Sequence, residues 1–95
     1  MALTLESIVR IARDALSCQL DGETTILNTH SGNYFGLDEV GASVWRLMSA
    51  PHTVAQIISA ITAEYDVETA QCEADLLSLI NLLAAHGLVE ISTKA

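Results

Sequence analysis

The feature that most constrains this chain is a change in the spacing of its apolar residues at Asp38. Before Asp38, apolar and polar residues alternate over short segments such as residues 15–20, and Asp21-Gly22 and His30-Ser31-Gly32 separate these segments. Alternation is the period of a β-strand, and Asp-Gly favours a tight hairpin because glycine accepts a positive φ. After Asp38, apolar residues recur every three or four positions, as on one face of an α-helix. The pattern therefore predicts strands first and helices afterwards.

Turn and cap residues set the expected bounds of these elements. Strands are predicted at residues 15–20, 23–28, 33–37 and 88–92, and a short mixed run at residues 7–13 also fits a strand. Helices are predicted over about residues 39–48, 54–65 and 70–86, with Asp38, Thr53 and Thr69 as N-caps and Gly87 as the C-terminal stop. The predicted fold class is α+β and winged-helix-like: a three-stranded antiparallel sheet, then a three-helix bundle and a short C-terminal strand.

Length and charge limit the functions open to the chain. Its 95 residues suit a single domain spanning residues 1–95, and its net charge is −8. Nucleic-acid binding and attachment to anionic membranes both depend on basic residues, so the charge disfavours both. The N-terminus has no signal-peptide pattern, and no apolar run approaches the roughly 20 residues of a membrane span, so we expect a cytoplasmic protein.

The residue types that catalyse reactions or bind metals form no recognisable constellation here. His30, His52 and His86 fall at predicted turns or helix ends, without ligand partners at a fixed spacing. Cys18 and Cys72 are far apart in the sequence, and we expect reduced thiols that pack as small hydrophobic residues. The sequence therefore predicts a protein that is not an enzyme and that holds neither a metal nor another cofactor.

A sheet edge and an apolar helix are the candidate binding features. The outer strand of a three-stranded meander has unpaired backbone groups, which accept an added strand from a peptide. On the third predicted helix, Leu77 and Leu82 widen an apolar stripe on its two sides. The stripe consists of Cys72, Leu76, Leu79, Ile80 and Leu83. Such a band fits either a groove for a partner or a core shared between sheet and helices, and the pattern alone favours the shared core.

Four stretches of the sequence together resemble a known family. They are Leu20-Asp-Gly-Glu23, the run Ser31-Gly-Asn-Tyr-Phe-Gly-Leu-Asp-Glu-Val-Gly-Ala-Ser-Val-Trp45, Thr53-Val-Ala-Gln-Ile57, and Glu73-Ala-Asp-Leu76 followed by Leu82-Leu83 and Gly87-Leu-Val89. Over residues 15–90 the chain resembles the PqqD-like family of leader-peptide-binding domains, also called RiPP recognition elements. Residues 36–41 and 66–72 are most similar to the stand-alone domains of lasso-peptide biosynthesis.

The resemblance implies a function and a set of site residues. Domains of this family bind the leader of a ribosomally synthesised precursor peptide and present it to a separate leader peptidase or other maturation enzyme. The leader is expected to add as an antiparallel strand beside residues 33–37, against the third helix. The implied peptide-binding residues are Asn33, Tyr34, Phe35, Gly36, Leu37, Asp75, Leu76, Leu79 and Leu82. Phe35, Leu37 and Trp45 are expected to face the core.

On the third helix, two flanks compete for the groove. Asp75 matches an acidic position typical of the family, and a helical wheel places it beside Leu79 and Leu82. We therefore expect this flank to face the leader, in preference to the flank of Glu73 and Leu77.

Three other functions stay open at this point. The domain could be a peptide chaperone for a radical-SAM enzyme, as in pyrroloquinoline quinone synthesis, which changes the partner but not the binding. It could be a winged-helix DNA-binding protein, which the net charge disfavours. It could also be a structural subunit of a larger enzyme. A short precursor gene beside this one would separate these readings.

Overall fold

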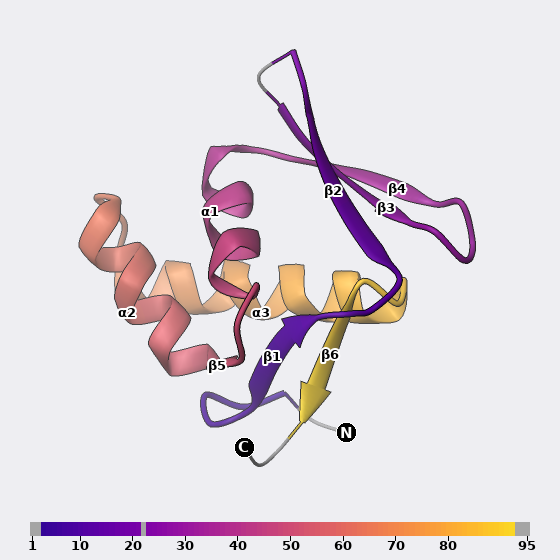
Figure 1. The fold of residues 1–95 in the computed structure, drawn as a ribbon. Coiled ribbons are helices and arrows are strands. Elements are labelled where there is room, and N and C mark those ends of the chain that lie inside the picture. The colour runs from indigo at the N-terminus through magenta and orange to yellow at the C-terminus, as the bar shows by residue number, and fades with distance from the viewer. Residues whose placement is uncertain (1–2, 22, 93–95) are drawn as a thin grey trace.

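The structure, a computed structural model, describes residues 3–21 and 23–92 and confirms the predicted α+β class (Figure 1). Strands occupy the first part of the chain, three helices follow, and a strand ends it. The elements are β1 (Ile8–Ile11), β2 (Ala15–Leu20), β3 (Glu23–Asn28), β4 (Tyr34–Leu37), α1 (Glu39–Leu47), β5 (His52–Thr53), α2 (Val54–Glu64), α3 (Thr69–Ala85) and β6 (Val89–Ser92).

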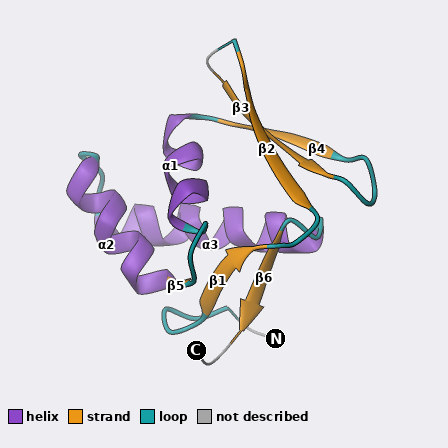
Figure 2. Ribbon diagram, viewed as in Figure 1, coloured by secondary structure: helices purple, strands orange, loops and turns teal. Residues whose placement is uncertain are grey.

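The strands form two separate antiparallel sheets (Figure 2). One is the predicted meander, in the order β2-β3-β4, and the other has the order β5-β1-β6. The second sheet was not predicted. Its strand β1 pairs with strands from the middle and the end of the chain, and the spacing of apolar residues along the sequence does not indicate pairing between distant strands. The two-residue β5 is also too short to show an alternating pattern.

The β2–β3 hairpin closes with a two-residue turn. Leu20 pairs with Glu23, and Asp21 has a φ of 53°. A positive φ at the first turn position is what a tight hairpin of this kind requires. Gly22, the other predicted turn residue, lies outside the described residues.

Two of the three predicted N-caps are confirmed. The Asp38 carboxylate accepts a hydrogen bond of 2.7 Å from the Gly41 amide, and Thr53 forms a capping box with Gln56 at the start of α2. The prediction of Thr69 as the cap of α3 was wrong. Glu68 occupies the N-cap position with an extended backbone and makes no side-chain cap bond, so Thr69 is already the first helical residue.

The core lies among the three helices and includes residues of both sheets. Trp45 is 4% exposed and Leu37 is buried, which confirms both as core residues, and Phe35 is half-buried against the same cluster. The other large side chains with almost no exposure come from β1, β3, α2, α3 and the segments that follow α1 and α3: Val9, Ile26, Met48, Val54, Ile57, Ile61, Ile80, Leu83 and Leu88.

The two cysteines differ from the expectation that both pack as small hydrophobic residues. Cys18 is exposed, because it lies on the face of the sheet that the helices do not cover, so that prediction was wrong. Cys72 on α3 is partly buried and packs against the core. Both thiols are free, as expected. Within residues 3–21 and 23–92, no helix has the length and apolar character needed to cross a bilayer.

Candidate functional site

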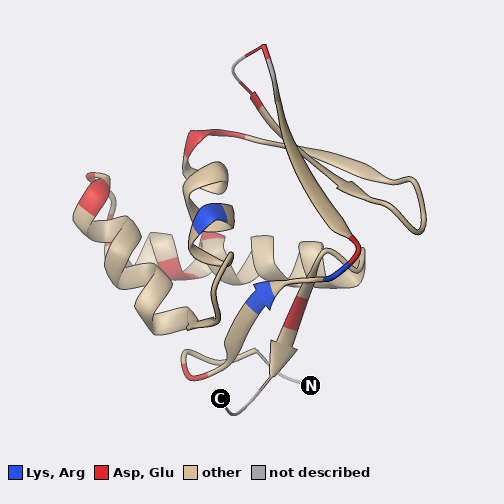
Figure 3. Cartoon of the chain, viewed as in Figure 1, with Lys and Arg blue, Asp and Glu red and all other residues tan. Residues whose placement is uncertain are grey.

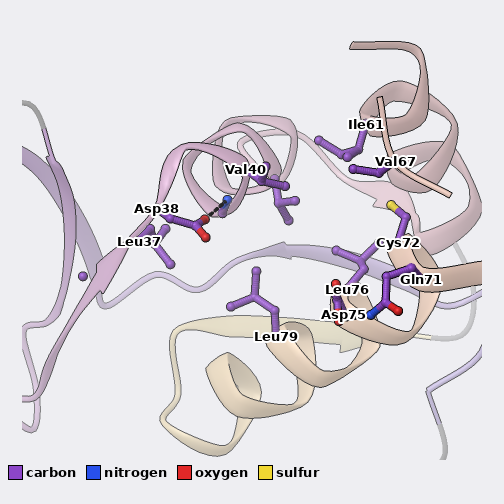
Figure 4. Close-up of a pocket in the computed structure, with 13 residues that line it drawn as sticks. Leu37, Asp38, Val40, Ile61, Val67, Gln71, Cys72, Asp75, Leu76 and Leu79 are labelled. Atoms are coloured by element: carbon purple, nitrogen blue, oxygen red, sulfur yellow. Dashed lines mark hydrogen bonds between the residues drawn. The ribbon is translucent and has the colours of Figure 1, made fainter. Parts of the chain in front are cut away.

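An apolar groove of about 570 Å³ lies between the end of β4 and α3 (Figure 4). The end of β4 and the start of α1 form one wall, α3 forms the opposite wall, and α2 and the segment before α3 contribute residues from the third side. Its lining residues are Gly36, Leu37, Asp38, Val40, Gly41, Val44, Ile61, Val67, Gln71, Cys72, Asp75, Leu76 and Leu79.

The wall formed by β4 and α1 depends on a tight connection between these two elements. Asp38 ends the strand and caps the helix at once. A Cβ atom on Gly41 would lie 3.1 Å from the Asp38 carboxylate and 3.4 Å from the Leu37 side chain. The first distance is shorter than an ordinary contact, so glycine lets the helix start directly beside the strand without displacing the Asp38 carboxylate.

Strand β4 is an edge strand, and the direction of its backbone groups follows from the pairing register. The Asn28 amide donates to the Asn33 carbonyl at 2.8 Å, so these two residues form a hydrogen-bonded pair. In an antiparallel ladder such pairs alternate, so Phe35 and Leu37 also direct their N–H and C=O groups toward β3. Tyr34 and Gly36 therefore direct theirs away from β3, toward the open edge.

The wall formed by α3 combines apolar side chains with one carboxylate. Leu76 is buried and Leu79 is half-buried, and both face the groove (Figure 4). Asp75 is exposed, and one of its oxygens accepts a hydrogen bond of 2.9 Å from the Gln71 side chain. Among the described residues, its second oxygen has no partner, so this carboxylate retains capacity to accept a hydrogen bond from a ligand.

The structure brings five of the nine expected site residues to the groove: Gly36, Leu37, Asp75, Leu76 and Leu79. The other four lie elsewhere. Asn33 is exposed in the turn before β4, and Phe35 packs against the core on the inner face of the sheet. The side chains of Tyr34 and Leu82 are 72% and 46% exposed, outside the groove. Only the backbone groups of Tyr34, which face the open edge of β4, are placed to meet a ligand strand.

The two flanks of α3 are clearly separated in the structure. Asp75 and Leu79 line the groove, whereas Glu73 and Leu77 do not. The groove also shows that the broad apolar band of α3 has two roles. Its central residues are core, as Ile80 and Leu83 are almost fully buried, while its Asp75 flank borders the open groove.

Sequence reasoning missed most of the groove residues outside β4 and α3. Val40 belongs to the apolar stripe of α1 yet is 36% exposed, and Val67 in the segment before α3 is 40% exposed. A stripe residue cannot be distinguished from a groove residue by spacing alone, because both repeat with the helical period. Gln71 carried no sequence signal, since its role depends on its contact with Asp75.

A second cluster holds β4 to the far end of α3. The buried Asn28 side chain donates a hydrogen bond of 2.8 Å to the carbonyl of His86, the C-cap of α3. The His86 ring also meets the Phe35 ring edge-on, with centroids 4.6 Å apart. Sheet and helix are therefore fixed together at this end, so the groove has a defined width.

The electrostatics of the groove favour a ligand that is neutral or positive. Burial raises the pKa of the Cys72 thiol, and the neighbouring Asp75 carboxylate raises that pKa further. Cys72 therefore stays protonated and uncharged near neutral pH, and the carboxylates of Asp38 and Asp75 carry the charge of the lining. Acidic residues are spread over the molecule, as Figure 3 shows.

Within residues 3–21 and 23–92 the only basic residues are Arg10, Arg13 and Arg46, which is few for nucleic-acid binding. Arg10 is paired with Glu90 across β1 and β6 at 2.7 Å, and Arg46 donates to the Ser43 hydroxyl at 2.9 Å. In the part of the chain that the structure describes, His, Cys, Asp and Glu side chains also form no cluster of three able to hold a metal ion.

Comparisons with known proteins agree with this geometry. The family described as coenzyme PQQ synthesis protein D (PqqD) matches residues 23–89. Among solved structures, TbiB1 in complex with the TbiA(beta) leader peptide is 36% identical, with a TM-score of 0.77, and the match covers 85% of this chain and 94% of TbiB1. Lasso peptide synthetase B1 complexed with its leader peptide is 26% identical, with a TM-score of 0.76, covering 86% of this chain and 96% of that one.

A third solved structure is the PqqD part of PqqCD from Methylobacterium extorquens, described as a functional, stand-alone RiPP recognition element. It is 25% identical, with a TM-score of 0.78, and the match covers 94% of this chain and 95% of that one. No curated protein matches the chain.

The fold is that of a RiPP recognition element. The chain belongs to the PqqD family, and the resemblance to the leader-binding domains of lasso-peptide synthesis is confirmed.

Proposed function

We propose that this chain binds the leader of a ribosomally synthesised precursor peptide, as an added strand on β4 that lies against α3. The observation that carries this proposal is the direction of the backbone groups of Tyr34 and Gly36, which face the open edge beside an apolar groove. A peptide strand placed there pairs its backbone with β4 and inserts alternate side chains between β4 and α3.

The chemistry of the groove indicates which leader side chains it accepts. The groove provides an apolar surface from Leu37, Leu76 and Leu79, so burial of an aliphatic or aromatic leader side chain there is favourable. Asp75 offers a hydrogen-bond acceptor with a negative charge at the rim, so a Lys or Arg of the leader, or a backbone N–H, is a suitable partner. The net charge of −8 further favours a leader segment that is not acidic.

In this proposal the chain is a non-catalytic adaptor of a lasso-peptide pathway that presents the leader to a separate leader peptidase or another maturation enzyme. This part of the proposal is supported by the two solved relatives with bound leader peptides, one of which is a lasso peptide synthetase. Service to a radical-SAM enzyme, as in the quinone-cofactor pathway, would use the same groove with a different partner. The acidic surface argues against DNA as a ligand.

Calorimetry with two synthetic leaders tests the proposal. One is the TbiA(beta) leader, and the other is the leader of a short precursor, if one is encoded beside the gene for this chain. We expect saturable binding of at least one leader with a stoichiometry of one, no binding of the same peptide in scrambled order, and no cleavage of the peptide by this chain alone. Equal binding of native and scrambled peptides would contradict sequence-selective recognition.

A further inference from the structure

The outer face of the β2-β3-β4 sheet carries an apolar row that neither the core nor the groove uses. Leu16 pairs with Leu27, and Leu27 pairs with Tyr34, so these three side chains stand side by side on one face of the sheet. Ile26 and Phe35 of the neighbouring row face the core, which places the first three on the opposite side. Leu16, Leu27 and Tyr34 are here called the outer row.

All three side chains of the outer row are exposed to solvent. Leu16 is 60% exposed, Leu27 is 37% exposed and Tyr34 is 72% exposed. The adjacent row on the same face consists of Cys18, Thr25 and Gly36, so the two rows together contain no Asp, Glu, Lys or Arg in a chain of net charge −8. Three exposed apolar side chains that lie side by side on an uncharged face, rather than singly, form a surface suited to contact with another protein.

Size and charge argue against a second copy of this chain as the occupant. A face three strands wide and about 20 Å long covers roughly 300 Å², whereas a stable dimer buries about 800 Å² on each partner. Two chains that each carry a net charge of −8 also repel one another. The patch suits a transient contact with a protein whose docking surface is apolar and not acidic.

The outer row also continues toward the proposed leader site. A leader strand paired with β4 becomes the next strand of the same sheet, and its residue opposite Tyr34 stands on the same face as the row. The row then gains a fourth member from the leader. A partner that docks on this face contacts the domain and the bound peptide together.

We infer that the outer row, extended by the leader, is the docking surface for the enzyme that acts on the bound precursor. This inference rests on the proposed leader binding at β4. The complete surface exists only when the leader strand is present. In this way the enzyme would distinguish a domain with bound leader from one without it. The two surfaces are separate, since the side chains of the outer row do not line the groove.

The test uses the double variant Leu16→Thr, Leu27→Thr, which keeps strand-forming residues and removes the exposed apolar surface. The matched control is Leu5→Thr, because Leu5 is 42% exposed but lies in the loop before β1, outside the row and the groove. Each protein is titrated with the TbiA(beta) leader and the neighbouring-gene leader. Each is then titrated, with and without leader, with the purified leader peptidase that cleaves the precursor carrying that leader.

The inference predicts that one such enzyme binds the wild type and the control more tightly when leader is present. It predicts that the double variant binds the leader normally but loses about tenfold or more in affinity for that enzyme. If the double variant is not folded by circular dichroism, Leu16→Thr alone is used with the same expectation.

Three results would overturn the inference. If the double variant binds leader and its affinity for the enzyme is unchanged, the outer row is not the docking surface, and the proposed function is unaffected. A wild-type dimer in sedimentation equilibrium that the double variant abolishes would assign the row to a second copy instead. Failure of the wild type to bind either leader would remove the proposed function, and this inference with it.

Discussion

Replacing Gly36 by proline and by alanine gives a matched pair that tests the backbone pairing of β4. The Gly36 N–H points away from β3, so neither change removes a hydrogen bond within the sheet. Alanine keeps this N–H, and a Cβ at Gly36 meets no atom within 4 Å. Proline removes the N–H and places its ring at the open edge, where proline is tolerated in an edge strand.

The two variants are predicted to separate binding from stability. Gly36→Ala is expected to raise the free energy of unfolding by about 0.4–1 kcal/mol, because alanine loses less backbone entropy on folding than glycine. It should bind leader nearly as the wild type does. Gly36→Pro leaves a leader carbonyl without its donor, which costs about 1–3 kcal/mol, or roughly 5- to 150-fold in Kd.

Calorimetry with leader and thermal unfolding monitored by circular dichroism supply both readouts. The reasoning fails in either of two ways. If Gly36→Pro binds leader as tightly as Gly36→Ala, the leader does not pair with the edge of β4. If Gly36→Pro unfolds the protein, the Gly36 N–H is needed within the sheet, and the deduced direction of the backbone groups is wrong.

Three further variants or probes test other parts of the site. Asp75→Asn is expected to weaken leader binding by about 1–3 kcal/mol with little change in Tm, and Asp75→Lys is expected to weaken it more. The control Glu68→Gln should bind leader normally. Equal calorimetric affinities for all of these proteins would mean that Asp75 is a solvent-exposed residue without a role in leader binding. Cys72 should react more slowly with iodoacetamide than the exposed Cys18, because burial and Asp75 raise the pKa of Cys72 and only the thiolate reacts. Asp75→Asn should lower the Cys72 pKa and speed its reaction. Added leader should slow the reaction at Cys72 alone, and peptide mass spectrometry would measure the modification of each cysteine. Asn28→Ala removes the hydrogen bond to the carbonyl of His86, the C-cap of α3, together with the two bonds that the Asn28 side chain accepts from the His30 and Ser31 amides. It should lower the unfolding free energy by at least about 1–3 kcal/mol, whereas an unchanged Tm would mean that the Asn28 side chain does not hold sheet and helix together.

Much of the fold follows from local residue patterns, because turns and caps act over a few positions. Asp21 and Asp38 illustrate this: one permits a two-residue hairpin through its positive φ, and the other marks the change from strand to helix through its bond to the Gly41 amide. The pairing of β1 with β6 could not be predicted in this way. It joins residues such as Arg10 and Glu90 from opposite ends of the chain, and no local period encodes that contact.

The site was predictable to a smaller extent than the fold. Family resemblance placed the groove between β4 and α3 and identified Asp75 and Leu79 as neighbours there, and the structure places both at the groove. It did not separate backbone from side-chain roles within residues 33–37. The register does so, because it turns the Phe35 side chain toward the core and the Tyr34 side chain toward solvent. Val40 and Val67 were not predicted as groove residues, because their exposure depends on how the elements pack.

The most direct test of leader binding by strand addition is hydrogen exchange resolved to single amides of β4. In the free protein, the amides of Phe35 and Leu37 donate to β3 and should exchange slowly, while those of Tyr34 and Gly36 face the open edge and should exchange quickly. Added leader is predicted to slow exchange at Tyr34 and Gly36 by about tenfold or more and to leave Phe35 and Leu37 slow. Protection confined to the ends of the helices, with Tyr34 and Gly36 unchanged at saturating leader, would contradict strand addition.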